Sequence, residues 1–137
     1  MPSAPRASLV YLDSSALVKL VVHEPETTAL LEFLAGWPYR VSSALARVEV
    51  LRAVKRTGAS PAVHRRAVRV LARVALIKID DPVLSGAARI APPGLRTLDA
   101  IHLATACSLD GLAGIVTYDA RLGRAAARAR FKVWSPG

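Results

Sequence analysis

Four of the ten acidic residues in this 137-residue chain lie where their carboxylates could meet at one site. Asp13 follows a short apolar run near the N-terminus, and Asp119 follows another near the C-terminus. Asp99 falls in the first turn of an expected helix, where free amides and the helix dipole favour an anion. Glu49 lies inside a partly apolar helical stretch, where an unpaired carboxylate is costly and usually has a function. These four side chains are the candidate functional residues.

Carboxylates that converge need a positive charge among them. Two of them about 4 Å apart repel by about 1 kcal/mol in water and by about 4 kcal/mol at an intermediate dielectric. The chain has one cysteine, and its histidines are scattered at positions 23, 64 and 102, which argues against a zinc site. Carboxylate oxygens with water instead suit Mg²⁺ or Mn²⁺. Such ions activate water and stabilise a leaving alkoxide, so the four acids are compatible with hydrolysis of a phosphodiester.

Most of these residues also have simpler interpretations. Asp13, Asp99 and Asp119 could each cap or begin a helix. His102 lies three residues after Asp99, so it could contact a phosphate or act near a leaving group, or it could be structural. Arg96 could contact RNA or a partner, or it could be a solvated loop charge.

Alternating strands and helices must position these side chains. The expected strands are 8–12, 40–42, 75–79, 114–117 and 131–134, and the expected helices are 15–22, 26–35, 44–57, 61–74, 81–90, 98–109 and 121–129. Strands that alternate with helices, each brief and apolar, predict an α/β fold with a mainly parallel sheet. Ligands bind outside the carboxyl ends of such strands, where Asp13 and Asp119 lie.

Polar residues mark several of the expected helix starts. Ser43 and Thr97 are expected to cap the helices that follow them. Asp80 and Asp81 are interpreted as a further cap and left out of the candidate site. The region 38–43 has the weakest strand signal, because proline and arginine dilute its β-favouring residues.

The composition fits one soluble domain over residues 1–137. Apolar residues make up 53% of the chain and aromatic residues only 5%, so Leu, Val, Ile and Ala must build the core. No apolar run approaches the roughly 20 residues of a membrane span, and the polar N-terminus is unlike a signal peptide. The single cysteine, Cys107, excludes an internal disulfide and is expected in the core. We therefore expect a cytoplasmic protein that does not bind membranes.

The charge balance indicates a polyanionic partner. The chain has 19 Lys and Arg against 10 Asp and Glu, a net charge of +9. Most of the basic residues are arginine, which can bind a phosphate through two parallel hydrogen bonds, although a GC-rich genome could also explain the excess over lysine. A stripe on the expected helix 61–74 could bind nucleic acid or be a solvated face; it consists of Arg65, Arg66, Arg69 and Arg73.

Four segments resemble the signature blocks of PIN-domain nucleases, in the order found in that family. They are YLDSSALVKL (11–20), SSALARVEVLRA (42–53), LRTLDAIHLATA (95–106) and VTYDARL (116–122). Each block is weak alone, VTYD above all, but the four together span nearly the whole chain. The resemblance implies a three-layer α/β/α fold with a mainly parallel central sheet. It also implies a metal-dependent endoribonuclease, similar to the VapC-like toxin of a VapBC toxin–antitoxin pair.

The resemblance carries the family's acidic positions onto Asp13, Glu49, Asp99 and Asp119, and its hydroxyl positions onto Ser15 and Thr117. It implies that the first three acids hold one Mg²⁺ or Mn²⁺ and that the fourth helps, directly or through water, to place this ion or a second one. It further implies an RNA substrate, a cognate VapB-like antitoxin and a homodimer, for which Leu30, Leu31 and Leu34 are interface candidates or core residues. The alternative is a non-catalytic RNA-binding module. A phosphotransfer receiver fits poorly, because the chain lacks an acidic pair at its first strand.

Overall fold

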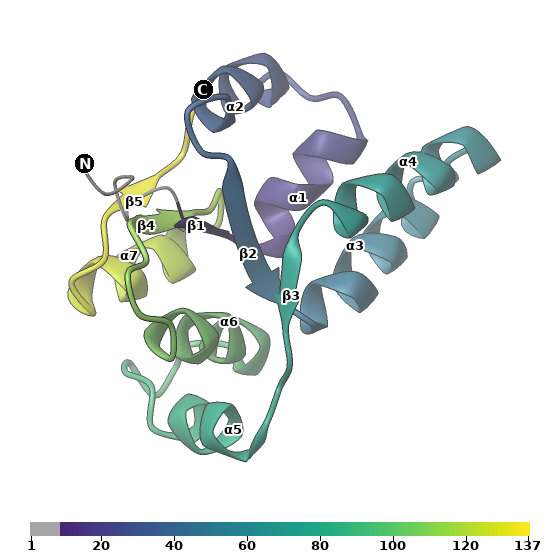
Figure 1. The fold of residues 1–137 in the computed structure, drawn as a ribbon. Coiled ribbons are helices and arrows are strands. Elements are labelled where there is room, and N and C mark those ends of the chain that lie inside the picture. Colours follow the sequence, from purple (N-terminus) through teal and green to yellow (C-terminus); the bar gives the residue numbers. More distant parts are fainter. Residues whose placement is uncertain (1–8) are drawn as a thin grey trace, which may run out of the picture.

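A five-stranded parallel sheet lies at the centre of the protein, which the computed structural model describes over residues 9–137 (Figure 1). The strands are β1 (Leu9–Leu12), β2 (Tyr39–Ser43), β3 (Ala75–Ile77), β4 (Gly114–Val116) and β5 (Val133–Trp134). Their order across the sheet is β3-β2-β1-β4-β5, and all four pairings are parallel. β1 therefore lies in the middle of the sheet. The chain adds β2 and β3 on one side of β1 and then β4 and β5 on the other side. The predicted first strand began at Ser8, which lies outside the described residues.

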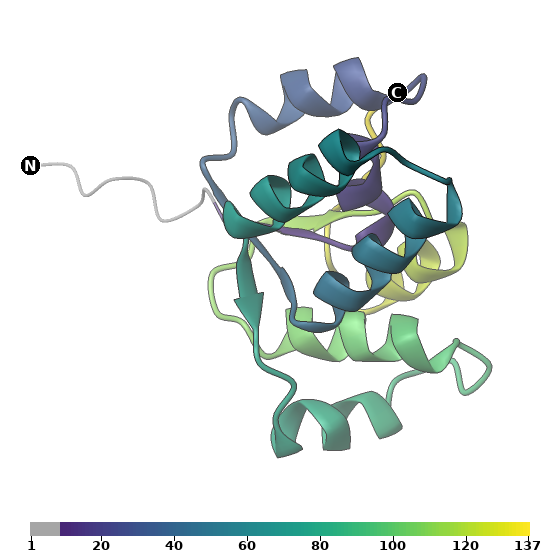
Figure 2. The ribbon, with the colours of Figure 1, turned by 90° about the vertical axis from the view of Figure 1, so that its right-hand side faces the viewer.

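Helices cover both faces of this sheet, so the protein has the expected three-layer α/β/α architecture (Figure 2). The helices are α1 (Ser14–Val21), α2 (Thr27–Leu34), α3 (Leu45–Arg56), α4 (Pro61–Ala72), α5 (Asp81–Ala88), α6 (Thr97–Cys107) and α7 (Ala120–Arg128). Among residues 9–137, none of the helices combines the length and the apolar character needed to cross a membrane.

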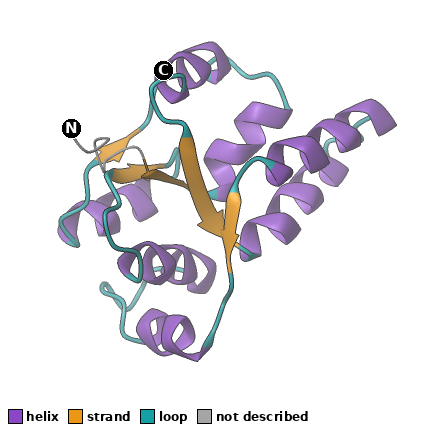
Figure 3. Ribbon diagram, in the orientation of Figure 1, coloured by secondary structure: helices purple, strands orange, loops and turns teal. Residues whose placement is uncertain are grey.

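The side chains of β1 alternate between two cores because successive residues of a strand point to opposite faces. Val10 and Leu12 pack with apolar residues of α1 to α4. Tyr11 packs on the other face, with Leu103 of α6 and Leu122 of α7. Helix α5 packs mainly against α6, as an outer addition to that layer (Figure 3).

The observed element boundaries correct two of the predicted caps. Ser43 is the last residue of β2, although its hydroxyl still accepts a hydrogen bond from the Leu45 amide at 3.1 Å. Thr97 is the first residue of α6 rather than its cap. The extended backbone of Arg96 occupies that position, with no side-chain capping bond. The predicted Asp80 cap is confirmed, because its carboxylate accepts from the Val83 amide at 3.0 Å.

The side chain of Cys107 differs from its expected environment, and two leucines of α2 occupy one of their two expected environments. Cys107 is exposed, since the buried face of α6 ends at the preceding alanine and leaves the cysteine in the last turn. Leu30 and Leu34 are almost fully buried in the core, so core packing accounts for them, and only Leu31 of that group is exposed.

Candidate active site

All four predicted acids line one cavity at the carboxyl edge of the sheet. The cavity has a volume of about 230 Å³ and is lined by Asp13, Ser14, Ser15, Glu49, Arg96, Thr97, Leu98, Asp99 and Asp119. The acids come from four places in the chain: the end of β1, the middle of α3, the first turn of α6 and the residue before α7. The crossing of the chain on either side of β1 brings these segments together, as in other open parallel sheets.

Asp13 is the most deeply buried acid, at 3% exposure. Its Oδ1 accepts hydrogen bonds from the Ser15 hydroxyl at 2.6 Å and from the Ala16 amide at 3.0 Å, and its Oδ2 accepts from the Thr117 hydroxyl at 2.6 Å. Burial raises the pKa of Asp13 above its usual value, and the two hydroxyls oppose that rise. Asp13 does cap α1, as the simpler interpretation proposed, but only its Oδ1 accepts the capping hydrogen bond, and its Oδ2 is bonded to Thr117 instead.

Ser15 and Thr117 also join the loop after β1 to the loop after β4. The Ser15 hydroxyl accepts from the Tyr118 amide at 2.9 Å, and the Thr117 hydroxyl accepts from the Asp119 amide at 3.0 Å. Each hydroxyl therefore donates to Asp13 while accepting from a backbone amide of the loop after β4. This arrangement fixes the position of the Asp119 backbone relative to Asp13.

Two hydrogen bonds in series connect Glu49 to the central strand β1, through His102 and Tyr11. His102 Nε2 lies 2.6 Å from Glu49 Oε1, and His102 Nδ1 lies 2.7 Å from the Tyr11 hydroxyl. Tyr11 and His102 are both almost fully buried. Burial raises the pKa of Tyr11, so this hydroxyl keeps its proton and can donate it to Nδ1. In the tautomer with its proton on Nε2, His102 accepts from Tyr11 and donates to Glu49.

Asp99 and Asp119 share one cationic partner, Arg96. Arg96 Nε and Nη2 each lie 3.0 Å from Asp99 Oδ2, and Nη2 also contacts Asp119 Oδ2. Burial raises the pKa of Asp99, and the Arg96 guanidinium opposes that rise. Asp119 Oδ1 meanwhile accepts from the Arg121 and Leu122 amides, so this acid also caps α7.

The cavity offers a donor set that suits a hard divalent cation. Its acids supply carboxylate oxygens, Ser14, Ser15 and Thr97 add hydroxyls to its lining, and no cysteine lines it. Within residues 9–137, no three His, Cys, Asp or Glu side chains are arranged as a ready-made metal site. Each of the four carboxylates accepts at least one hydrogen bond from a protein donor. Of these donors, the Arg96 side chain is the most exposed, at 58%, so it can move without disturbing the core.

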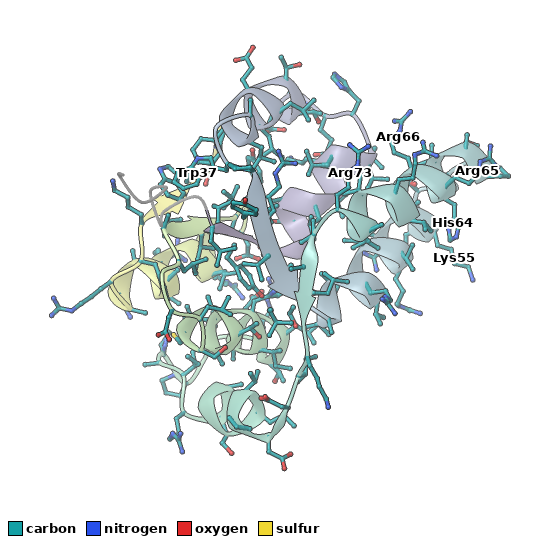
Figure 4. The ribbon with its side chains drawn as sticks, in the orientation of Figure 1. Trp37, Lys55, His64, Arg65, Arg66 and Arg73 are labelled. Atoms are coloured by element: carbon teal, nitrogen blue, oxygen red, sulfur yellow. The ribbon has the colours of Figure 1, made fainter. Side chains whose placement is uncertain are left out.

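The arginine stripe lies apart from this cavity. Its members belong to α4 or its C-cap, and none is among the described residues that line the site. Arg65 and Arg66 project from α4 at the edge of the molecule (Figure 4). The Arg66 guanidinium donates to the Val21 carbonyl at 3.3 Å, so one member has a structural contact.

Sequence reasoning did not identify Tyr11 and left the role of His102 open. A tyrosine in a buried strand needs a partner for its hydroxyl, which is the signal that could have drawn attention to Tyr11. The sequence does not indicate that His102 is its partner, because the two residues are 91 positions apart.

Comparison with known proteins relates most of the chain to one family. The family model described as "PIN domain" matches residues 10–128. "Ribonuclease VapC46" of Mycobacterium tuberculosis is 48% identical over 128 residues, which cover 93% of this chain and 97% of that protein. "Ribonuclease VapC35" of the same species is 42% identical over 137 residues, covering 94% and 98%.

Two solved structures share the fold. A toxin–antitoxin complex from Klebsiella pneumoniae superposes with a TM-score of 0.70 at 22% identity, covering 93% of this chain and 98% of that one. VapC20 of Mycobacterium tuberculosis, titled a sarcin–ricin loop cleaving toxin, superposes with a TM-score of 0.70 at 17% identity, covering 93% and 99%. At these identities the two likenesses concern the fold alone.

Proposed function

Because this chain belongs to the PIN-domain family, we propose that it is a metal-dependent endoribonuclease that acts as the toxin of a toxin–antitoxin pair. The observation that carries this proposal is the single cavity lined by Asp13, Glu49, Asp99 and Asp119. The names of the relatives, ribonucleases at 40–48% identity over nearly the full chain, support the same activity.

Asp13, Glu49 and Asp99 would hold one Mg²⁺ or Mn²⁺, with Asp119 helping directly or through water. When bound, the ion supplies the charge that activates a water molecule and offsets negative charge on the phosphoryl oxygens. Ser15 and Thr117 keep the Asp13 carboxylate oriented, and His102 orients that of Glu49. The exposed Arg96 guanidinium can exchange a carboxylate for a substrate phosphate, since it binds both through the same planar fork.

RNA, a VapB-like antitoxin and a second copy of the chain are the proposed partners. The net charge of +9 supports an RNA substrate, because it attracts polyanions. The fold shared with a protein solved as a toxin–antitoxin complex supports an antitoxin. A homodimer is proposed from the family resemblance, and light scattering of the purified protein tests it. Acting on cellular RNA would place the protein in the cytoplasm.

Cleavage that depends on a divalent ion tests the function directly. The purified protein, free of antitoxin, would be incubated with several structured RNAs in the presence of Mg²⁺, Mn²⁺ or a chelator. We expect defined fragments with either ion and intact RNA with the chelator, because the acids alone repel a phosphodiester. Equal RNA integrity in all samples would contradict the proposal and favour a non-catalytic RNA-binding module.

Replacing Arg96 with glutamine is expected to tighten Mn²⁺ binding several-fold. The guanidinium competes with the ion for the Asp99 and Asp119 oxygens, and its positive charge repels a dication beside it. Calorimetric titration with Mn²⁺ measures the affinity. Arg128→Gln removes the same charge from the last turn of α7 and is the control, with no change expected. Weaker binding by the Arg96 variant would show that this side chain supports the ion rather than competing with it.

A further inference from the structure

A further cavity lies between α7 and the loop that leads into α6. It has a volume of about 240 Å³, with Pro92, Gly94 and Leu95 on the loop side and Arg121, Arg124 and Arg128 on the α7 side. None of these residues lines the candidate active site. The two cavities are nevertheless neighbours, because Leu95 directly precedes Arg96 and Arg121 follows Asp119 by two positions. A large molecule bound in the site can therefore reach this second cavity, which we call the α7 cavity.

The three arginines of the α7 cavity lie along one face of the helix. Their spacing of three and then four positions spreads them over about 10 Å of its length, on the face opposite the buried Leu122 and Ala126. All three side chains are exposed. Within residues 9–137, none of these guanidinium groups forms an ion pair. The cavity therefore presents three free positive charges.

A solvated face is the simpler interpretation of charges on an amphipathic helix, but α7 carries charges of only one sign. Its sequence, ARLGRAAAR, contains no acid. Like charges three and four positions apart destabilise a helix, and here no acid on α7 offsets them. A bound anion would offset this repulsion. Arginine binds phosphate through two parallel hydrogen bonds, so a phosphate-bearing ligand suits the cavity.

The rest of the cavity lining favours the backbone of a double helix over unpaired bases. Pro92 and Leu95 are half-buried, and no aromatic residue is among the described residues that line the cavity. Proteins that bind single strands stack the bases on aromatic side chains. Double-stranded RNA is instead recognised through its shape and its phosphates. A row of cations about 10 Å long, with no platform for bases, matches the second kind of ligand.

We propose that the α7 cavity is a second RNA-binding site, at which Arg121, Arg124 and Arg128 hold the phosphates of a double-stranded stem next to the segment that is cut. The proposal rests on the proposed nuclease function, because it takes RNA as the partner and the four acids as the place of cleavage. It adds a reason for the protein to prefer structured RNA, since an unpaired strand gains little from this surface.

The test compares two double variants that remove the same charge. Arg124→Gln/Arg128→Gln alters the α7 cavity and leaves Arg121, beside Asp119, unchanged. Arg65→Gln/Arg69→Gln on α4 is the matched control, because both pairs have an i, i+4 spacing, are exposed and end in the last turn of their helix. Helices α4 and α7 lie on opposite sides of the molecule (Figure 1). Thermal melts verify that both variants fold.

Binding is measured by fluorescence anisotropy in chelator, so that cleavage does not interfere, with a labelled RNA hairpin and with its unpaired loop sequence alone. We expect the α7 variant to bind the hairpin on the order of tenfold more weakly and the loop sequence almost as well as wild type. The slope of log affinity against log salt concentration should fall by roughly 1.4 to 1.8 for the hairpin. Each phosphate contact contributes about 0.7 to that slope on a single strand and about 0.9 on a DNA duplex. The control variant should retain most of the wild-type affinity for both RNAs.

Equal losses in the two variants would overturn the proposal, because the effect would then be one of net charge. Unchanged hairpin binding by the α7 variant would also overturn it and leave the arginines as a solvated face. An equal loss for the hairpin and the loop sequence would overturn the assignment to a double-stranded stem. A protein that loses hairpin affinity as expected but leaves the hairpin uncut in Mg²⁺ and Mn²⁺ would support the second site and contradict the nuclease function alone. The Mn²⁺ titration contains no RNA, so Arg128→Gln remains a control there.

Discussion

Replacing Asp13 with asparagine is expected to lower RNA cleavage by at least about 100-fold, beyond the loss of 10- to 100-fold that removing support for a metal ligand usually causes. The fold should be at least as stable as before. Because burial raises the pKa of Asp13, its ionisation costs folding stability as the pH rises through that pKa, and asparagine carries no such charge. The Asn carbonyl can accept from Ser15 and Ala16, and its amide can donate to Thr117. Gel assays of cleavage and thermal melts at neutral pH measure both effects.

Asp80→Asn is the matched control for this substitution. Asp80 caps α5 through a hydrogen bond from the Val83 amide at 3.0 Å, the same length as the bond from Ala16 to Asp13, but it lies outside the site. It should keep full cleavage and a melting temperature within a few degrees, since about 1 kcal/mol shifts the melting temperature of a domain this size by about 4 °C. Full cleavage by the Asp13 variant would leave that residue as a helix cap only.

Local sequence signals were enough to predict most of the elements. The apolar runs before Asp13 and Thr117 are short because buried parallel strands are short, and both were predicted within two residues of their observed ends. The family resemblance added the three-layer arrangement, which the structure and the comparisons confirm. Strand β2 extends beyond the predicted 40–42 because its pairing with β1 and β3, rather than its own composition, holds its ends.

Side-chain contacts between segments far apart in the chain could not be predicted from the sequence. The pairing of Tyr11 with His102 depends on how α6 lies across the central strand, and a sequence pattern does not specify that contact. Arg96 was predicted to contact RNA or a partner, or to be a solvated loop charge, and its bridge between Asp99 and Asp119 was not anticipated. Asp13 and Asp119 show why capping and function need not compete: each uses one oxygen to cap a helix and presents the other to a different side chain.

Replacing His102 with phenylalanine is expected to weaken Mn²⁺ binding and to slow cleavage by about 10- to 100-fold. The ring keeps most of the buried volume but can neither accept from Tyr11 nor donate to Glu49. It should also lower the free energy of unfolding, because a buried hydroxyl without a partner costs about 1–3 kcal/mol. Mn²⁺ titration calorimetry, cleavage rates and thermal melts separate these effects.

His102→Gln is expected to restore most of the Mn²⁺ affinity that phenylalanine loses. The glutamine carbonyl can accept from Tyr11 while its amide donates to Glu49, so the orientation of that carboxylate is kept. Tyr11→Phe should fall between the two, because it leaves Nδ1 without its donor and frees His102 to exchange the proton between its nitrogens. If His102 were only a packing residue, the phenylalanine variant would match wild type in Mn²⁺ affinity at equal fold stability, and glutamine would offer no advantage. That outcome would remove His102 from the support of Glu49.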